Sequence, residues 1–196
     1  IGKQLPIDRI KAGIQALASK KNDTLENGTE AAKAIMTTDT FEKQIAVEIE
    51  VAGKIVTIGG MAKGSGMIHP NMCTMLSFIT TDAVITKEAL QKALSDDVND
   101  TYNMISVDGD TSTNDTVVLL AKGMAENEEI TVGTKEYEDF AEALHVINEY
   151  LAKKIAGDGE GATALFEVTV VNADTKETAR VLAKSIVCSN LTKTAI

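Results

Sequence analysis

Apolar residues recur every three or four positions in five parts of the chain, a spacing that places them on one face of a helix. The clearest repeat runs from Phe140 to Ile155 and stops at the glycine-rich run 157–161. Pro6 suits the first turn of the first repeat, and Thr86 suits the N-cap of the third. The predicted helices cover residues 6–17, 29–36, 86–98, 140–155 and 178–187, and in the last of them we expect Val181, Leu182 and Ile186 to face inward.

Strand patterns lie between these helices. Large apolar residues alternate with their neighbours from Ile45 to Val51, and residues 52–53 supply a turn into a returning strand at 54–58. We expect this hairpin to lead into a glycine-rich loop that begins at residue 59. Three further apolar runs predict strands at residues 75–80, 117–120 and 165–171, of which the second is expected to be buried. The mixture of helices and hairpins, without an internal repeat or a linker, indicates an α+β fold.

The composition is that of a soluble globular protein: of 196 residues, 44% are hydrophobic and 24% are charged. This length fits one large domain or two small ones. No apolar run approaches the ~20 residues of a membrane-spanning helix, and no charged and apolar leader opens the chain, so we expect neither a membrane partner nor secretion. The two cysteines, Cys73 and Cys188, match no disulfide framework and no metal motif, which favours a reducing cytoplasm.

The net charge of -10 argues against a nucleic-acid partner. Residues 1–73 hold 9 Lys and Arg against 8 Asp and Glu, whereas residues 74–196 hold 10 against 21. The boundary between the two compositions coincides with the chemically suggestive position 74, although an acidic helical face is usually only solvated surface. Because the chain starts at Ile1 without a methionine, we expect it to be a segment of a longer polypeptide.

The run from Lys63 to Leu76 holds the strongest candidate for chemistry. Thr74 follows a glycine-rich loop, in which glycines permit positive φ and close backbone approach. A threonine hydroxyl becomes a good nucleophile when a base takes its proton, and cleavage of the chain just before Thr74 would free its own α-amine for that role. The pKa of such an amine, roughly 7.7–8, suits a general base at neutral pH. The structural alternative is a strand threonine that packs its methyl group inward.

Two charged residues are candidate substrate contacts. Lys63 can bind a substrate carboxylate, although a solvated loop lysine is the default for its type. Glu160 stands among the three glycines of 157–161, which suggests that backbone is held close to a ligand while the carboxylate points at a substrate ammonium. The alternative for Glu160 is an exposed glutamate in a helix C-cap.

Other suggestive residues have structural explanations. Residues 108–115 resemble a calcium loop in composition but lack the spacing and the final glutamate of an EF-hand, so we expect a polar turn with side-chain-to-backbone hydrogen bonds. We expect His69 to serve the turn beside Pro70, because nothing places a serine against it. We expect His145, on the long helix, at the surface or in helix packing.

Together the motifs resemble the glutamate N-acetyltransferase (ornithine acetyltransferase) family of arginine biosynthesis, the ArgJ family. They appear in the family order and span nearly the whole chain, and their combination is far more specific than any one of them. The resemblance identifies the chain as a central segment of such an enzyme. The matching motifs are Met36–Thr40, Gly60–Met72, Thr74–Leu76, Asp108–Asp115, Gly157–Thr163 and Lys193–Ile196.

The resemblance implies a fold and a mode of maturation. The fold is α+β, a mixed layered α/β sandwich with sheets packed between helices, as in self-cleaving amino-terminal-threonine enzymes of the DmpA and ArgJ type. The precursor cleaves itself between Cys73 and Thr74, so that residues 1–73 end the α chain and residues 74–196 begin the β chain of one interleaved catalytic region. The assembly is an α2β2 heterotetramer that includes the complementary chain segments.

The resemblance also implies the reaction. The Thr74 hydroxyl takes the acetyl group of N-acetylornithine as an ester and passes it to glutamate, in a ping-pong transfer that needs no metal or other cofactor. Thr37 and Lys63 contact substrate from the α side, and Thr74 and Glu160 contact it from the β side. Acetyl-CoA remains open as a second acetyl donor, because bifunctional and monofunctional members share these motifs.

The chain departs from the family pattern in two places and lacks parts of the site. Cys73 stands where alanine is usual, and Ala164 stands where the family often has lysine or arginine. The family's oxyanion Thr-Gly pair lies before the position of Ile1, and an Asn and a Thr that contact substrate lie beyond Ile196. Because each lost oxyanion donor costs on the order of 10²–10³ in rate, we expect this segment alone to be incomplete as an enzyme.

Two other interpretations remain. A self-cleaving amidohydrolase or aminopeptidase of similar architecture would pass the acyl group to water instead of glutamate. A non-enzymatic fragment would use its glycine loop only structurally. Lys63 and Glu160 together suit a zwitterionic amino acid and favour the transferase.

Overall fold

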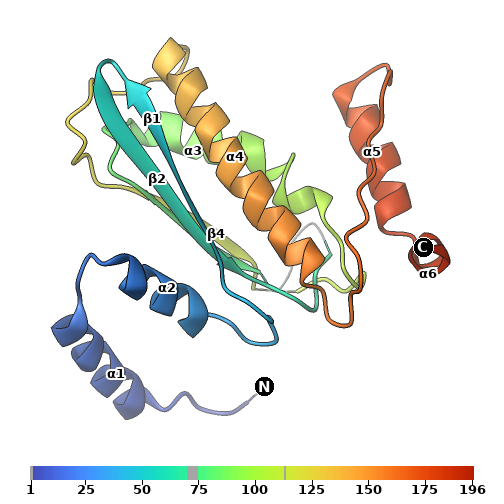
Figure 1. Ribbon diagram of the computed structural model, residues 1–196, viewed down its shortest axis with the longest axis horizontal. Coiled ribbons are helices and arrows are strands. Elements are labelled where there is room, and N and C mark those ends of the chain that lie inside the picture. The colour runs from blue at the N-terminus through green and yellow to red at the C-terminus, as the bar shows by residue number, and fades with distance from the viewer. Residues whose placement is uncertain (1, 70–74, 113) are drawn as a thin grey trace.

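A mixed four-stranded sheet forms the centre of the structure, a computed structural model that describes residues 2–69, 75–112 and 114–196. β1 and β3 run antiparallel to β2, and β4 lies parallel to β3. The turn from β1 to β2 is tight because Ala52 and Gly53 both take positive φ, at 49° and 79°. The strands are β1 (Lys43–Val51), β2 (Lys54–Lys63), β3 (Leu76–Thr81) and β4 (Thr116–Ala121), in the spatial order β1-β2-β3-β4 (Figure 1).

Helices α3 (Lys87–Val98) and α4 (Lys135–Gly157) cover one face of this sheet. Gly60 of β2 allows the close approach of α4, because a Cβ there would lie 2.9 Å from Ile147 Cγ2 and 3.1 Å from Leu151 Cδ1. The apolar repeat of α4 forms one core with the inward side chains of β2 and β3. The fully buried side chains of this repeat are Phe140, Leu144, Ile147, Leu151 and Ile155.

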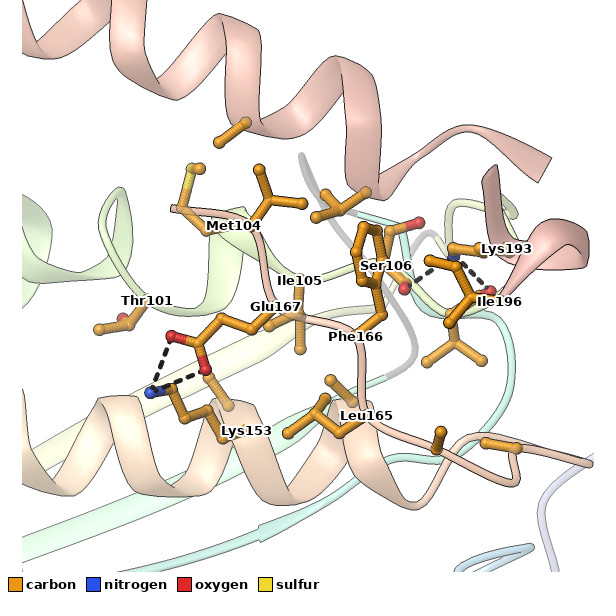
Figure 2. A pocket seen from close by; sticks show the side chains of 18 of the residues that line it. Thr101, Met104, Ile105, Ser106, Lys153, Leu165, Phe166, Glu167, Lys193 and Ile196 are labelled. Atoms are coloured by element: carbon orange, nitrogen blue, oxygen red, sulfur yellow. Dashed lines mark hydrogen bonds and ion pairs between the residues drawn. The ribbon is translucent and has the colours of Figure 1, made fainter. Parts of the chain in front are cut away.

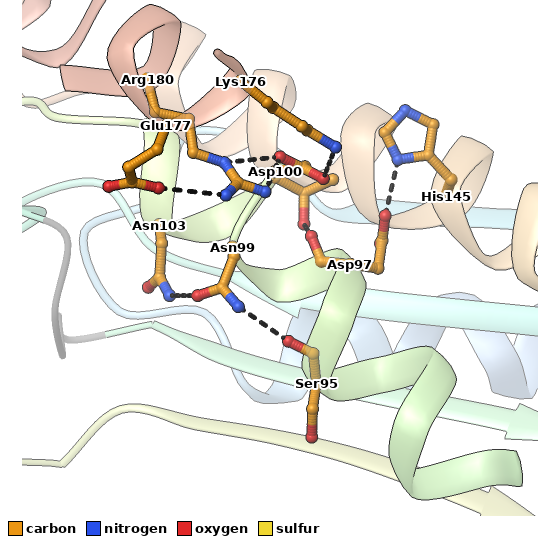
Figure 3. Close-up of polar contacts among 10 residues, drawn as sticks. Ser95, Asp97, Asn99, Asp100, Asn103, His145, Lys176, Glu177 and Arg180 are labelled. Carbon is orange, nitrogen blue, oxygen red and sulfur yellow. Dashed lines mark hydrogen bonds and ion pairs between the residues drawn. The ribbon is translucent and has the colours of Figure 1, made fainter.

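The helices at the two ends of the chain lie outside this core (Figure 1). Asp100 holds α5, since its carboxylate accepts hydrogen bonds from Lys176 Nζ at 2.6 Å and from Arg180 Nε at 2.8 Å (Figure 3). None of the described helices is both long enough and apolar enough to cross a membrane. The terminal helices are α1 (Ile7–Lys20), which buries no residue, α2 (Leu25–Ala34), α5 (Lys176–Val187) and α6 (Asn190–Ala195). The short 3₁₀ helix η1 (Tyr102–Met104) follows α3, and its Tyr102 belongs to the core.

The predicted helices all form, and the α+β class is confirmed. Thr86 caps α3, because its hydroxyl accepts a hydrogen bond from the Ala89 N–H at 3.2 Å. His145 serves helix packing, since its Nδ1 lies 2.6 Å from Asp97 Oδ1 on α3 (Figure 3). The described residues supply one sheet of the expected layered arrangement, with its helices on one face.

Four local predictions are wrong. Residues 165–171 form no strand, although their apolar run suits one. In β4, predicted to be buried, Leu119 is buried but Leu120 is 59% exposed. The predicted inward side of α5 faces solvent, with Val181 58% exposed. β2 continues through Gly59 and Gly60 to Lys63, so the glycine-rich loop begins only at Gly64. In the first three cases the apolar pattern is present, but the described residues offer no surface that covers it.

Candidate active site

The loop that follows β2 connects segments from distant parts of the chain. The Gly64 N–H donates to Asp39 Oδ1 at 2.7 Å, and Ser65 Oγ donates to the Asp158 carbonyl oxygen at 2.7 Å. The Ser65 carbonyl oxygen accepts a hydrogen bond from the Glu160 N–H at 3.2 Å. The loop is therefore fixed on one side to the segment before β1 and on the other side to the C-terminal end of α4.

Lys63 and Thr37, two of the predicted substrate contacts, lie together. Lys63 is the last residue of β2 and is only 6% exposed, and its Nζ donates to Thr37 Oγ1 at 3.3 Å. Lys63 is thus not the solvated loop residue that is the default for a lysine. The Thr37 N–H donates to Asp39 Oδ2 at 3.1 Å, which fixes the threonine beside the end of β2.

The side chain of Glu160, the third predicted contact, lies directly against Gly66. A Cβ built at Gly66 would lie 2.6 Å from Glu160 Cδ and 2.7 Å from its Oε1. Gly66 on the facing loop is therefore the glycine that permits this close approach of the Glu160 side chain. Glu160 is exposed, so its carboxylate is open to a ligand.

The predicted cleavage junction, Cys73 and Thr74, lies outside the described residues. The described chain resumes at Met75, whose N–H donates to Asp115 Oδ1 at 2.9 Å. The β2–β3 ladder pairs Leu76 with Lys63. The residues that follow the junction in sequence are thus held between Asp115 and Lys63.

Asp115 is a residue of this region that the sequence alone did not single out. Burial raises the pKa of the Asp115 carboxyl, and the opposing effects of the Met75 N–H and the charge of Lys63 are smaller, so its pKa lies above the usual value. Its Oδ2 is buried and has no hydrogen-bond partner among the described residues. Its place at the end of the polar run 108–115 is the signal that could have found it.

The described residues of the run 108–115 make the side-chain-to-backbone hydrogen bonds that its composition predicts. Asp108 accepts hydrogen bonds from the backbone N–H of Ile68 at 3.1 Å and of Asp110 at 3.0 Å. His69 lies in the same region, with its Nδ1 3.1 Å from Ser106 Oγ. In the part of the chain that the structure describes, no group of three His, Cys, Asp or Glu is placed to hold a metal ion.

A pocket of about 530 Å³ opens beside the Glu160 segment. Lys193 closes one side of it, because its Nζ donates to the carbonyl oxygens of Ser106 and Val107 at 3.0 and 2.8 Å (Figure 2). The pocket has room for an aliphatic part of a ligand next to the carboxylate of Glu160. Its apolar wall includes Met104, Ile105, Leu165 and Phe166 (Figure 2).

Comparison with known proteins decides the family, since the ArgJ family model matches residues 1–196. The chain belongs to the ArgJ family. It is 56% identical over 196 residues to the arginine biosynthesis bifunctional protein ArgJ of Caldanaerobacter subterraneus subsp. tengcongensis, and 54% identical over 195 residues to that of Listeria monocytogenes. Each alignment covers 100% of this chain and 48% of the relative, so the chain spans about half the length of these curated relatives.

A solved structure agrees with this assignment. The crystal structure of the arginine biosynthesis bifunctional protein ArgJ from Bacillus halodurans is 54% identical in sequence to the chain. The two superpose with a TM-score of 0.60 over 61% of this chain and 56% of that one. The similarity supports the α+β fold described above.

Proposed function

We propose that the protein transfers an acetyl group from N-acetylornithine to glutamate through an ester on Thr74, after the chain is cut just before that residue. The observation that carries the proposal is the placement of a cation and an anion around one loop. Lys63 lies beside Thr37, and Glu160 lies against Gly66. Because an amino acid carries both a carboxylate and an ammonium, this arrangement supplies a charged partner for each.

In the proposed first half-reaction, the α-amine freed by cleavage takes the proton of the Thr74 hydroxyl. The hydroxyl oxygen attacks the acetyl carbonyl carbon of N-acetylornithine, and the amide C–N bond then breaks. The proton goes to the leaving amine, so ornithine departs and the acetyl-threonine ester stays. General acid–base help of this kind contributes typically about 10²–10⁴ in rate.

The second half-reaction reverses these steps with a different amine. The glutamate α-amine attacks the ester carbonyl carbon, the C–O bond to Thr74 breaks, and the threonine oxygen regains its proton. Lys63 and Thr37 bind the carboxylate of either substrate, and Glu160 binds the ammonium of the ornithine moiety. The steps use no cofactor, and acetyl-CoA is a second candidate donor to the same ester.

The cut between Cys73 and Thr74 divides the chain into residues 1–73 and residues 74–196. β2 of the first part pairs antiparallel with β3 of the second, and this ladder supports an interleaved region that stays together after the cut. We also propose that the oxyanion donors and further substrate contacts come from outside these residues, in a cytoplasmic α2β2 assembly. The relatives are about twice as long as this chain, which supports the contribution of further segments to the site.

Acetyl transfer by the complete protein tests the proposal. N-acetylornithine labelled in its acetyl group should give labelled N-acetylglutamate and an equal amount of ornithine. Without glutamate, ornithine labelled in its carbon skeleton should still become labelled N-acetylornithine when mixed with unlabelled N-acetylornithine, because the ester forms before glutamate binds. Free labelled acetate in place of N-acetylglutamate would identify the amidohydrolase instead, and labelled acetyl-CoA tests the second donor.

A further inference from the structure

Beneath the candidate site lies a lysine without access to solvent. Lys43 is the first residue of β1, and its side chain is 0% exposed. Its ammonium donates to Asp39 Oδ1 at 2.8 Å, to Asp158 Oδ2 at 2.6 Å and to the Phe41 carbonyl oxygen at 3.3 Å. Since an ammonium has three N–H donors, these three acceptors use all of them.

The two carboxylates that face this ammonium bind backbone as well. Asp39 accepts hydrogen bonds from the N–H groups of Thr37 and Gly64, and Asp158 accepts from the N–H of Thr40 at 3.0 Å and from its hydroxyl. Burial raises the pKa of both carboxyls, but the hydrogen bonds that they receive outweigh burial, so each pKa lies below its ordinary value. Both groups are therefore ionised at neutral pH, and the cluster is a cation between two anions.

Every predicted substrate contact among the described residues is attached to this cluster. Thr37 donates its own N–H to Asp39. Lys63 immediately precedes the glycine whose N–H donates to the same carboxylate. Glu160 stands two residues after Asp158, and the loop against which it lies is bonded to the Asp158 carbonyl oxygen. The cluster thus fixes the backbone at three points, each at or within two residues of one of the residues Thr37, Lys63 and Glu160.

A buried ion cluster is a poor device for stability alone, because well-packed apolar residues at such sites are often as stabilising or more so. Its directional bonds, however, fix three chain segments in one geometry. We propose that Lys43, Asp39 and Asp158 are positioning residues, which hold the three substrate-contacting side chains at a fixed spacing without touching substrate themselves. The proposal rests on the proposed function for what that spacing serves.

Kinetics of the complete protein with Lys43→Met test the proposal, with Lys43→Arg as the conservative variant. Lys135→Met is the matched control, because it removes an exposed lysine that pairs with Asp139 at the far end of α4. KM does not depend on how much of the enzyme is folded, so a merely structural role would lower the rate at saturation and leave KM unchanged. We expect KM for N-acetylornithine and for glutamate to rise at least tenfold in Lys43→Met, less in Lys43→Arg, and not in Lys135→Met.

Amide hydrogen exchange gives a readout that needs no catalysis. The N–H groups of Gly64 and Thr40, which donate to the two carboxylates, should exchange at least tenfold faster in Lys43→Met than in the wild-type protein or in Lys135→Met. If the wild-type protein makes no N-acetylglutamate, the proposed function fails, and exchange alone then decides whether the cluster holds the loops.

Asp158→Asn serves both measurements where Lys43→Met does not fold. Its single side-chain oxygen cannot replace the two acceptors of the carboxylate, so it should show the same changes in KM and exchange. Exchange at wild-type rates in a folded variant, or KM within twofold of wild type in an active one, overturns the proposal.

Discussion

Replacing Gly66 by alanine tests whether Glu160 acts where the structure places it. The new Cβ would lie 2.6 Å from Glu160 Cδ, whereas ordinary contact begins near 3.4 Å, so the carboxyl must move by about 0.8 Å. The carboxyl is the far end of a flexible side chain, and Gly66 does not adopt a positive φ. The backbone should therefore accept the methyl group.

The effect of Gly66→Ala should consequently fall on binding and not on folding. At a compatible position, Gly to Ala stabilises a protein by about 0.4–1 kcal/mol, because the unfolded chain loses freedom. A hydrogen bond to a charged group is worth about 1.5–3 kcal/mol. If the displaced carboxylate loses one such bond to the substrate ammonium, KM for N-acetylornithine should rise by about 10- to 150-fold.

Steady-state kinetics and a thermal melt of the complete protein measure both effects. Gly28→Ala is the matched control, because no atom lies within 4 Å of a Cβ at that position, and its KM should stay at the wild-type value. The expected result for Gly66→Ala is an unchanged or slightly higher melting temperature with a raised KM. A wild-type KM would refute the reasoning, since Glu160 would then not bind substrate from this position.

Three further outcomes are expected. Asp115→Ala should slow self-cleavage by about 10- to 150-fold, because it removes the charged acceptor that holds the Met75 N–H one residue after the junction. A gel time course with wild-type kinetics would count against that role. Gly60→Ala should cost about 1–3 kcal/mol of stability, measured by chemical unfolding, because its Cβ would crowd two core side chains of α4, and a neutral result would contradict the packing. The difference in melting temperature between wild type and Lys43→Met should narrow from pH 7 to pH 3. The two carboxylates that face Lys43 have lowered pKa values, so the stability they contribute is present above about pH 3.9 and is lost as pH falls through their lower folded values. A difference in melting temperature that grows as the pH falls would contradict this prediction.

The apolar pattern predicted burial correctly where this chain also supplies the surface against which the apolar face packs. The repeat in α4 predicts a buried face, and β2 and β3 provide the sheet against which it packs. The helical repeat in α5 and the apolar run 165–171 also predict buried side chains, yet the first is exposed and the second forms no ladder. A pattern tells which face can be buried, but burial also needs a partner surface that the local sequence does not contain.

The candidate site likewise has a part that the sequence predicts and a part that it does not. Thr37, Lys63 and Glu160 could be predicted as substrate contacts because short motifs carry them, and the structure places them around one loop. The buried cluster was missed, because a lysine at the start of an alternating strand is ordinarily a solvated residue. Lys43 is buried only because the chain returns to it 115 residues later with Asp158, a pairing that no local spacing predicts.

The most direct test concerns the peptide bond before Thr74 in the complete protein. Mass spectrometry and amino-terminal sequencing should find two chains, the second of which begins with Thr74. After incubation with N-acetylornithine alone, that second chain should carry an acetyl ester on the same residue. A single intact chain that transfers acetyl groups at the full rate would contradict the account.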